Sequence, residues 1–255
     1  EGYHYRRQEW FGCSCCPTNI ARFIANVPSF LYTSRGDELA VHQYAESVSM
    51  LKVSGQSVRV VQKTNYPWEG EIALEIAPEK TAVWCLAIRI PGWCKSAVVK
   101  VNGRKIKLAA ALSKGYARIQ REWRAGDVVT LSLSMTVDRV EAHPAVRQNA
   151  GRIALRRGPV VYCIESVDNG ADLNGIALLP DPAFEVTFGK GRILGGVPVI
   201  RAKAVRTKPQ GRKDLLYGDF GAWPRTACTV TAIPYFLWAN RKPGEMLVWI
   251  RQINS

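Results

Sequence analysis

The sequence predicts a mainly β fold in which short antiparallel strands are joined by tight turns. Runs rich in β-branched and aromatic residues recur along most of the chain, and they are separated by the turn signals SRGDE, SGQS, VNGR, SKG, RAGD and RRGP. Only one segment, near the beginning, has the apolar spacing of a convincing helix. Many short strands at such intervals are typical of one or more antiparallel β-sandwiches.

The one predicted helix runs from Pro17 to Val27. Proline suits the first turn of a helix, where a missing amide hydrogen costs nothing, and Pro28 stands at the predicted end. Apolar residues recur along one face at helical spacing: Ile20, Phe23, Ile24 and Val27. We therefore expect a short amphipathic helix ahead of the strands.

The strand pattern is clearest in the segment TLSLSM. There, Leu131, Leu133 and Met135 alternate with Thr130, Ser132 and Ser134. This period of two predicts a strand with one buried and one exposed face. The pattern gives way between Thr136 and Asn149, which we interpret as a domain junction, and a second junction is expected just after the helix.

Length and composition exclude some classes of protein. The chain has 255 residues, of which 47% are hydrophobic and 22% charged, enough to bury one sizeable core or two modest ones. Charged residues interrupt every apolar region, so no stretch approaches the roughly 20 apolar residues of a membrane helix. The chain starts at Glu1 with no signal-peptide pattern, and we expect its true N-terminus to lie upstream.

The charge is strongly basic but scattered. Lys and Arg number 35 against 21 Asp and Glu, a net charge of +14, which attracts polyanions in general. The densest basic segment, Arg206 to Lys213, is bracketed by proline and glycine, so a solvated loop is favoured over a nucleic-acid site. We expect no nucleic-acid partner.

Four of the seven cysteines stand alone in apolar, strand-like runs. These are Cys85, Cys94, Cys163 and Cys228, and we interpret them as small buried hydrophobic residues. The odd total and irregular spacing argue against a secreted disulfide scaffold. A reducing compartment, the cytoplasm, is therefore expected.

The other three cysteines, Cys13, Cys15 and Cys16, lie together in WFGCSCCPTNIAR, directly before the predicted helix. Zinc binds thiolates well, and a helix N-terminus also favours negative charge. However, the cluster offers at most three ligands, with no CxxC and no nearby histidine pair. Spacing alone leaves a metal or reactive-thiol site and plain structural cysteines as open alternatives.

The segment WFGCSCCPTNIAR resembles the signature of glycoside hydrolase family 127, the β-L-arabinofuranosidases. The resemblance continues in order through YPWEGEIALEI (Tyr66 to Ile76), LAIRIPGWC (Leu86 to Cys94), VNGRKI (Val101 to Ile106), GYARIQREWRAGDVVTLSL (Gly115 to Leu133), RGPVVYCIE (Arg157 to Glu165) and IPYFLWANRKPGEMLVWIR (Ile233 to Arg251). These segments together are far more specific than the cysteines alone.

The resemblance implies a catalytic α/α barrel followed by two antiparallel β-sandwiches, one inserted in the other. In this chain, residues 1–36 would be the truncated end of the barrel with its last helix, residues 37–137 the inserted sandwich and residues 138–255 the outer one. The implied activity is the retaining removal of β-L-arabinofuranosyl residues, and the implied partner is an arabinose-containing oligosaccharide or glycan. A homodimer is left open.

The resemblance also implies roles for the cysteines. Cys15, the first of the adjacent pair, would be the nucleophile and a zinc ligand, and Cys16 would be a second zinc ligand, whereas no role carries over to Cys13. The remaining ligands, a Glu and a Cys, and the acid/base Glu lie upstream in the family, beyond the start of this sequence. The fragment is therefore expected to be inactive alone.

Other candidates near the cluster have plainer interpretations. Glu9 is the nearest carboxylate and His4 the nearest imidazole, but a surface or hydrogen-bonding role is favoured for both. Trp10 is the tryptophan to test for stacking on a sugar, although most tryptophans in strand-rich segments belong to cores or interfaces. The alternative from another class is a non-catalytic carbohydrate-binding β-sandwich module with structural cysteines.

Overall fold

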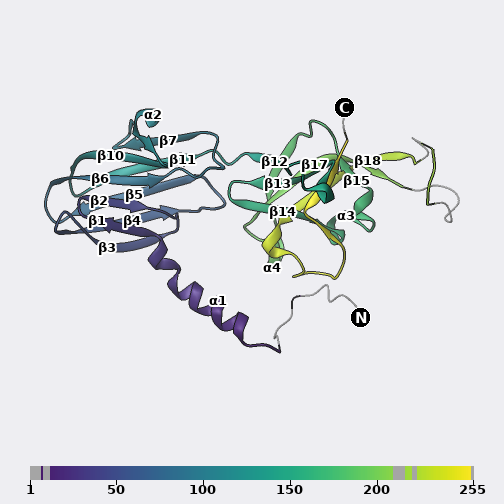
Figure 1. Ribbon diagram of the computed structural model, residues 1–255, viewed down its shortest axis with the longest axis horizontal. Helices are drawn as coiled ribbons and strands as arrows, with labels where there is room; N and C mark the ends of the chain where they lie inside the picture. The colour runs from purple at the N-terminus through teal and green to yellow at the C-terminus, as the bar shows by residue number, and fades with distance from the viewer. Residues whose placement is uncertain (1–6, 8–11, 209–215, 220–222, 254–255) are drawn as a thin grey trace. The chain divides into compact units, whose positions relative to one another are not determined.

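The computed structural model describes residues 7, 12–208, 216–219 and 223–253, and it divides into two compact units (Figure 1). The N-terminal unit contains residues 12–135, and the C-terminal unit contains Arg7 together with the described residues from Thr136 onward. Both are built mostly from strands, which confirms the prediction of a mainly β protein. In the described part of the chain, no helix is long and apolar enough to cross a membrane.

The N-terminal unit begins with α1 (Cys15–Asn26) and the short 3-10 helix η1 (Val27–Phe30), and it then forms two sheets. The first sheet has the strand order β1 (Tyr32–Arg35), β2 (Glu38–Val41), β6 (Ala82–Arg89), β10 (Tyr116–Trp123) and β9 (Leu112–Ser113). The second has the order β3 (Ser47–Val53), β4 (Gln56–Thr64), β5 (Glu71–Pro78), β11 (Asp127–Leu133), β7 (Ala97–Val101) and β8 (Arg104–Lys105). A single helical turn, α2 (Leu108–Ala111), precedes β9.

One hydrophobic core serves both sheets of this unit. Strand β11 buries every second residue, as the TLSLSM pattern predicts, although the strand ends at Leu133 and Met135 lies beyond it. At the centre, Trp84 and Trp123 are fully buried with their rings 5.2 Å apart, and Trp123 donates its indole N–H to the Trp84 carbonyl at 3.0 Å. The indole N–H of Trp84, in contrast, is buried and has no hydrogen-bond partner among the described residues.

The turn signals mark real strand connections. Ser54–Gly55 joins β3 to β4, and Asn102–Gly103 joins β7 to β8. Both residues of each pair have positive φ angles, the backbone of the two-residue turns that match the twist of a hairpin. Gly and Asn adopt this conformation at little cost, so the local signal is strong at Asn102–Gly103, whereas at Ser54–Gly55 it comes from the glycine.

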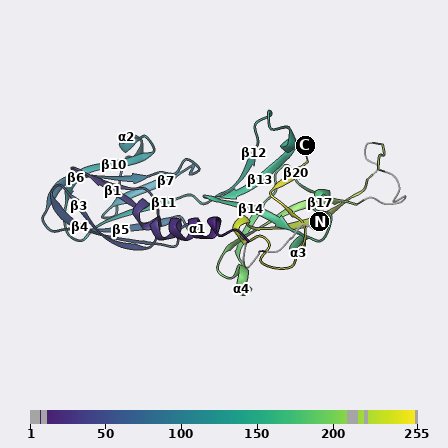
Figure 2. The ribbon, with the colours of Figure 1, turned by 60° about the horizontal axis from the view of Figure 1, so that its bottom comes forward.

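The predicted helix is also observed, starting two residues earlier than expected. Helix α1 covers Cys15–Asn26, with Ser14 as its N-cap, and Figure 2 shows it as one continuous helix leading through η1 to the first strands. In the described part of the chain, every other α-helix is a single turn of four residues. The prediction of one substantial helix is therefore confirmed.

The described residues of the C-terminal unit form a nine-stranded sheet. Its strand order is β12 (Val137–Glu141), β13 (Arg152–Arg157), β20 (Trp249–Gln252), β15 (Ile176–Leu178), β17 (Pro198–Thr207), β18 (Arg225–Pro234), β14 (Val160–Glu165) and β19 (Met246–Leu247), with β16 (Phe184–Phe188) paired to β17. An additional pairing joins β13 to β14, so the path of hydrogen-bonded strands closes on itself. Every strand of the closed path contributes to one core cluster.

Short helical turns connect these strands. They are η2 (Arg147–Asn149), α3 (Ser166–Asn169), η3 (Leu173–Gly175), α4 (Gly191–Leu194) and η4 (Tyr235–Leu237). Gly175, at the end of η3, lies so close to β17 that an added Cβ would stand 2.8 Å from the Thr207 carbonyl oxygen. Glycine is therefore required where η3 meets the strand.

The segment from Thr136 to Asn149, expected to lack a strand pattern, contains strand β12. The inward position of this strand is Asp138, which is 6% exposed, rather than an apolar residue. Its carboxylate accepts a hydrogen bond from Arg156 at 3.2 Å, and this partner offsets the burial of the charge. Hydrophobic alternation could not reveal a strand whose buried position is filled by an ion pair.

Asp127 gives the N-terminal unit a specific dependence on pH. The side chain is 7% exposed and accepts hydrogen bonds from the Asn102 amide at 2.7 Å and the Arg124 backbone N–H at 2.9 Å. Burial raises the pKa of Asp127, but these hydrogen bonds and the charges of Arg121 and Arg124 outweigh it and lower the pKa below its usual value. The ionised carboxylate therefore stabilises the fold above the unfolded-state pKa of about 3.9.

We expect Asp127→Asn to lower the free energy of unfolding at pH 7 by about 1–3 kcal/mol, because the hydrogen bonds to a charged acceptor are weakened. Stability from Asp127 is lost as the pH falls through its lowered folded-state pKa, so the difference from wild type should shrink below about pH 3. Thermal unfolding of both proteins across this range checks the result. Asp37→Asn, at an exposed position of the same unit, is the control, and an equal pH dependence in both variants would contradict the assignment.

Candidate active site

Cys13, Cys15 and Cys16 lie at the N-terminal end of α1, and all three are exposed, free thiols. Cys15 and Cys16 belong to the first turn of the helix. Thr18 reinforces this turn, since its hydroxyl donates to the Ser14 carbonyl at 2.9 Å and to the Cys15 carbonyl at 3.1 Å. The first turn contains no acidic residue, so the positive end of the helix dipole is available to anionic groups.

The three sulfurs lie in a row with Cys15 in the middle. The Sγ atoms of Cys13 and Cys15 are 3.1 Å apart, and those of Cys15 and Cys16 are 3.8 Å apart. The three side chains are exposed and their sulfurs are neighbours. Sulfurs in contact at a helix end are suited to metal binding, oxidation or nucleophilic attack.

The adjacent pair fits half of a zinc site. Zinc binds thiolate sulfur at about 2.3 Å in a tetrahedron, which places two ligating sulfurs about 3.8 Å apart. The Cys15 and Cys16 Sγ atoms have this separation, whereas the contact between Cys13 and Cys15 is shorter. Across the described ranges no group of three His, Cys, Asp or Glu side chains is arranged to hold a metal, so the fit concerns two ligands.

Mild oxidation is expected to join Cys13 to Cys15 as a disulfide. Their sulfurs are nearer to the bonded distance of about 2.05 Å than the other pair, and both are exposed. Diamide would accept two electrons and two protons from the two thiols, so the chain loses two hydrogen masses. Intact mass and peptide mapping check the product, which Cys13→Ser should suppress. A predominant link between Cys15 and Cys16 would contradict the prediction.

The lone cysteines behave differently from the cluster. Cys85 and Cys163 are buried, as predicted, while Cys94 and Cys228 are half-buried. Burial is the largest effect on the Cys163 thiol and raises its pKa to about 12, and burial also raises the pKa values of Cys85 and Cys228. These three thiols are therefore poor nucleophiles at neutral pH.

The remaining sequence candidates are distributed among several environments. His4, Glu9 and Trp10 lie outside the described residues. His42 bridges the Thr33 hydroxyl and the Tyr116 hydroxyl at 2.8 and 2.7 Å, a structural role. His143 accepts the backbone N–H of Ala145 through Nδ1 at 3.2 Å, which stabilises a surface turn.

The apolar face of α1 is exposed rather than packed. Ile20, Phe23, Ile24 and Val27 are 58%, 61%, 62% and 40% exposed, and the helix contains no buried residue. Isolated helices of this length are marginal in water, and a contiguous apolar stripe generally marks a contact surface. Phe23 stacks on Phe30 of η1 with ring centres 6.2 Å apart, but most of the apolar face of the helix that carries the cysteines remains exposed.

Arg7 makes contacts that the sequence did not predict. Its backbone N–H and side chain donate to three carbonyls of one loop, those of Ala239 at 3.3 Å, Trp238 at 2.9 Å and Phe236 at 2.9 Å. The guanidinium also lies 6.0 Å from the centre of the Trp238 ring. No local sequence pattern predicts this contact, because 231 positions separate Arg7 from Trp238.

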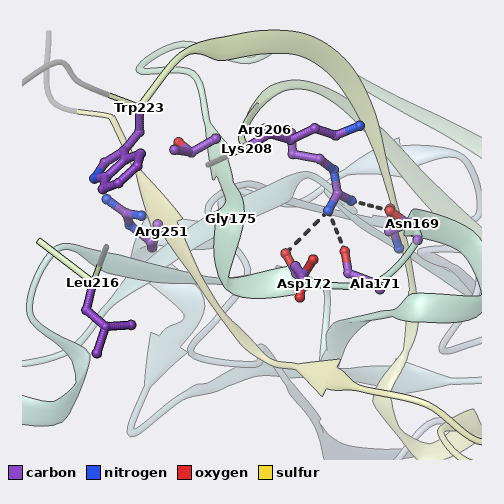
Figure 3. Close-up of a pocket in the computed structure, with 11 residues that line it drawn as sticks. Asn169, Ala171, Asp172, Gly175, Arg206, Lys208, Leu216, Trp223 and Arg251 are labelled. Carbon is purple, nitrogen blue, oxygen red and sulfur yellow. Dashed lines mark hydrogen bonds between the residues drawn. The ribbon is translucent and has the colours of Figure 1, made fainter. Parts of the chain in front are cut away.

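The basic segment from Arg206 to Lys213 is only partly the solvated loop that was predicted. Arg206 and Thr207 are the end of strand β17, and Lys208 follows it, whereas residues 209–213 lie outside the described residues. Figure 3 shows Arg206 and Lys208 at a pocket with Trp223 and Arg251. Sequence reasoning could not find this pocket, because its members come from strands and turns far apart in the chain.

Two family models match the chain along most of its length. Residues 38–135 match the middle domain of β-L-arabinofuranosidases of glycoside hydrolase family 127, and residues 137–251 match the C-terminal domain of glycoside hydrolase family 127. One residue separates the two matches, which together include most of both compact units.

Individual relatives agree with the family models. A non-reducing end β-L-arabinofuranosidase from Bifidobacterium longum subsp. longum is 36% identical over 96% of this chain and 38% of its own length. The crystal structure of a family 127 β-L-arabinofuranosidase from Geobacillus stearothermophilus T6 superimposes with a TM-score of 0.93 at 42% identity, covering 98% of this chain and 39% of that one. A further family 127 β-arabinofuranosidase structure has a TM-score of 0.87 at 33% identity, covering 98% and 40%. This chain thus spans about two fifths of the length of these relatives.

Proposed function

Because residues 38–135 and 137–251 match its middle and C-terminal domains, the chain belongs to glycoside hydrolase family 127, and we propose that it forms part of a retaining β-L-arabinofuranosidase with Cys15 as nucleophile. The observation that carries the proposal is the adjacent thiol pair at the exposed start of α1. Its sulfurs, 3.8 Å apart, have the spacing of two zinc-bound thiolates.

In the proposed reaction, the Cys15 sulfur attacks the anomeric carbon of a β-L-arabinofuranosyl residue of an arabinose-containing glycan. The glycosidic bond breaks, and its oxygen takes a proton from a carboxylic acid that lies outside this chain. Water then attacks the same carbon, gives its proton to the resulting carboxylate, and displaces the sulfur. Two displacements at one carbon retain its configuration.

In this scheme, Cys16 would be a zinc ligand beside Cys15. It is the next residue after Cys15 in the first turn of α1, and the two sulfurs lie 3.8 Å apart. Zinc, bound by both thiolates, would keep them deprotonated near neutral pH. The exposed Cys15 side chain remains accessible from the side away from the helix for attack on a sugar.

The proposal extends to the domain organisation. Residues 1–36 would be the end of a catalytic α/α barrel, residues 37–137 an inserted β-sandwich, and residues 138–255 the outer sandwich. Helix α1 would pack its exposed apolar face against the rest of that barrel, which supports the interpretation of this helix as a barrel element. Because the acid/base group would come from the same barrel, we expect the 255-residue chain to be inactive alone.

The zinc content of the full-length protein tests the role of Cys16. We expect about one tightly bound zinc per chain, and at least about a tenfold loss of affinity in Cys16→Ser, because a hydroxyl replaces a thiolate ligand. Atomic absorption after dialysis and a chelator competition measure both quantities. Cys228→Ser, a half-buried cysteine of β18, is the matched control. Unchanged zinc content in Cys16→Ser would rule out this ligand.

The activity itself is tested with an aryl β-L-arabinofuranoside. The full-length protein is expected to release the aryl group, and NMR should detect the β-anomer of arabinose first, before mutarotation. Binding of arabinose-containing oligosaccharides with no hydrolysis would instead support a non-catalytic carbohydrate-binding module.

A further inference from the structure

A pocket of about 920 Å³ lies on the C-terminal unit. It is lined by the turn from Asn169 to Asp172 after α3, by the ends of β17 and β20, and by Trp223 (Figure 3). This volume is within the range of pockets that hold small organic ligands and is large enough for two or three sugar rings. Nothing in the proposed hydrolysis uses this pocket.

One wall of the pocket is rigidly built. The Arg206 guanidinium donates to the backbone carbonyls of Asn169, Ala171 and Asp172, the Ala171 contact being 2.5 Å, as the dashed lines of Figure 3 show. The Asn169 amide in turn donates to the Thr231 carbonyl at 2.9 Å and accepts the Thr231 N–H at 2.8 Å. The turn is therefore preorganised, which lowers the entropy that a ligand must offset on binding.

The pocket is positively charged. Arg206, Lys208 and Arg251 line it against one carboxylate, that of Asp172, for a formal excess of two positive charges. Arg206 is committed to the turn, but the side chains of Lys208 and Arg251 form no hydrogen bond or ion pair with any described residue. These two cations are available to a ligand.

Another part of the pocket wall is the aromatic side chain of Trp223. Trp223 is half-buried, and Figure 3 shows its ring and the Arg251 guanidinium on the same side of the pocket. The face of an indole offers a flat apolar surface for the C–H face of a sugar ring, while a guanidinium binds a carboxylate with two parallel hydrogen bonds. The combination suits a ring that carries a negative charge.

We propose that this pocket binds a uronosyl residue of an acidic glycan, with the sugar ring on Trp223 and its carboxylate held by Arg251 and Lys208. Lys208 and Arg251 are exposed in the structure, and a neutral sugar would offer their charges no partner, whereas a carboxylate can accept hydrogen bonds from both. A nucleotide could satisfy the same chemistry, with its base on the indole and its phosphate on the cations. The choice of a glycan rests on the proposed glycosidase function, and it implies that the enzyme binds arabinose-bearing chains through an acidic segment.

Isothermal titration calorimetry of the full-length protein with tetragalacturonate tests this site. We expect binding that weakens with added salt, and at least about a tenfold higher Kd in Arg251→Gln and in Trp223→Ala, since each removes one of the two recognition contacts. Lys203→Ala is the control. It removes the same kind of charge from an exposed position of β17 outside the pocket, and its Kd should not change.

Three comparisons can overturn the proposal. Equal affinity for a neutral L-arabinotriose would remove the requirement for a carboxylate, and an unchanged Kd in the Arg251→Gln, Trp223→Ala double variant would exclude this pocket. Tighter binding of AMP, lost in the same variants, would identify a nucleotide site instead.

Cys15→Ser should bind tetragalacturonate like wild type. If the full-length protein binds tetragalacturonate but has no arabinofuranosidase activity, the proposed function is refuted and the acidic-sugar site is retained.

Discussion

Cys15→Ser in the full-length protein is expected to lower kcat for an aryl β-L-arabinofuranoside by at least about a thousandfold, with a much smaller change in KM. A serine hydroxyl is not ionised near neutral pH, and it binds zinc more weakly than a thiolate does. It also leaves carbon less readily in the second displacement. Substrate binding through the rest of the active site would be unaffected, so the loss should fall on the chemical step.

Steady-state kinetics at matched zinc content measure this effect, because zinc loss alone would otherwise imitate it. Cys228→Ser controls for the removal of a thiol elsewhere in the chain, and we expect its kcat to match wild type. Rapid quenching and intact mass should reveal one arabinosyl group attached to the wild-type chain, mapped to the peptide that contains Cys15. A Cys15→Ser protein that keeps kcat within tenfold of wild type would remove the nucleophile assignment.

Arg241→Ala is expected to destabilise the C-terminal unit by about 3–5 kcal/mol, because it leaves a buried carboxylate without its partner. Arg241 contacts Glu165 at 2.7 Å and Asp168 at 2.5 Å, and the Glu165 side chain is only 4% exposed. Hydrogen bonds to Asp168 are the largest cause of the raised pKa of Arg241, which stays charged at every relevant pH. Glu165 also accepts the Ala239 N–H at 3.2 Å, so the cluster ties the loop after β18 to β14.

Urea unfolding followed by intrinsic fluorescence measures the change, with the C-terminal unit produced alongside the full chain so that the transitions of the two units can be separated. Lys242→Ala removes an exposed cation at the next position and should change the free energy of unfolding by less than about 0.5 kcal/mol. Arg241→Lys should give an intermediate loss, because one ammonium cannot pair with both carboxylates in the same geometry. Equal stability of the alanine variants at 241 and 242 would contradict the role of the cluster.

Much of the local structure of this chain is predictable because it depends on neighbours in sequence. The period of α1 follows from Ile20, Phe23 and Ile24, and the alternation of β11 follows from Leu131 and Leu133. The hairpins at Gly55 and Gly103 follow from residues that accept positive φ. The place of the cysteine cluster, at the start of a helix, was also predicted from its own segment.

Other features depend on partners that only the folded chain brings together. Asp138 is buried in β12 because Arg156 lies opposite it in β13. Arg206 lies near the end of β17, where its guanidinium donates to backbone carbonyls that follow α3. The same applies to the pocket at Trp223 and Arg251. None of these residues carries a local signal, since charged side chains far from their partners in sequence have the pattern of a solvated surface.

The sequence by itself determined the mainly β character and the single helix of α1, because each depends on residues within a few positions of one another. The roles proposed for Cys15 and Cys16 are instead what the resemblance to the family implies. Only the tertiary structure decided which basic side chains pair with distant groups. The buried pairing of Arg241 with Glu165 and the contact of Arg206 with the Ala171 carbonyl join residues that lie far apart in the chain. They arise when backbone geometry and long-range packing select one arrangement among the many that the same local patterns allow.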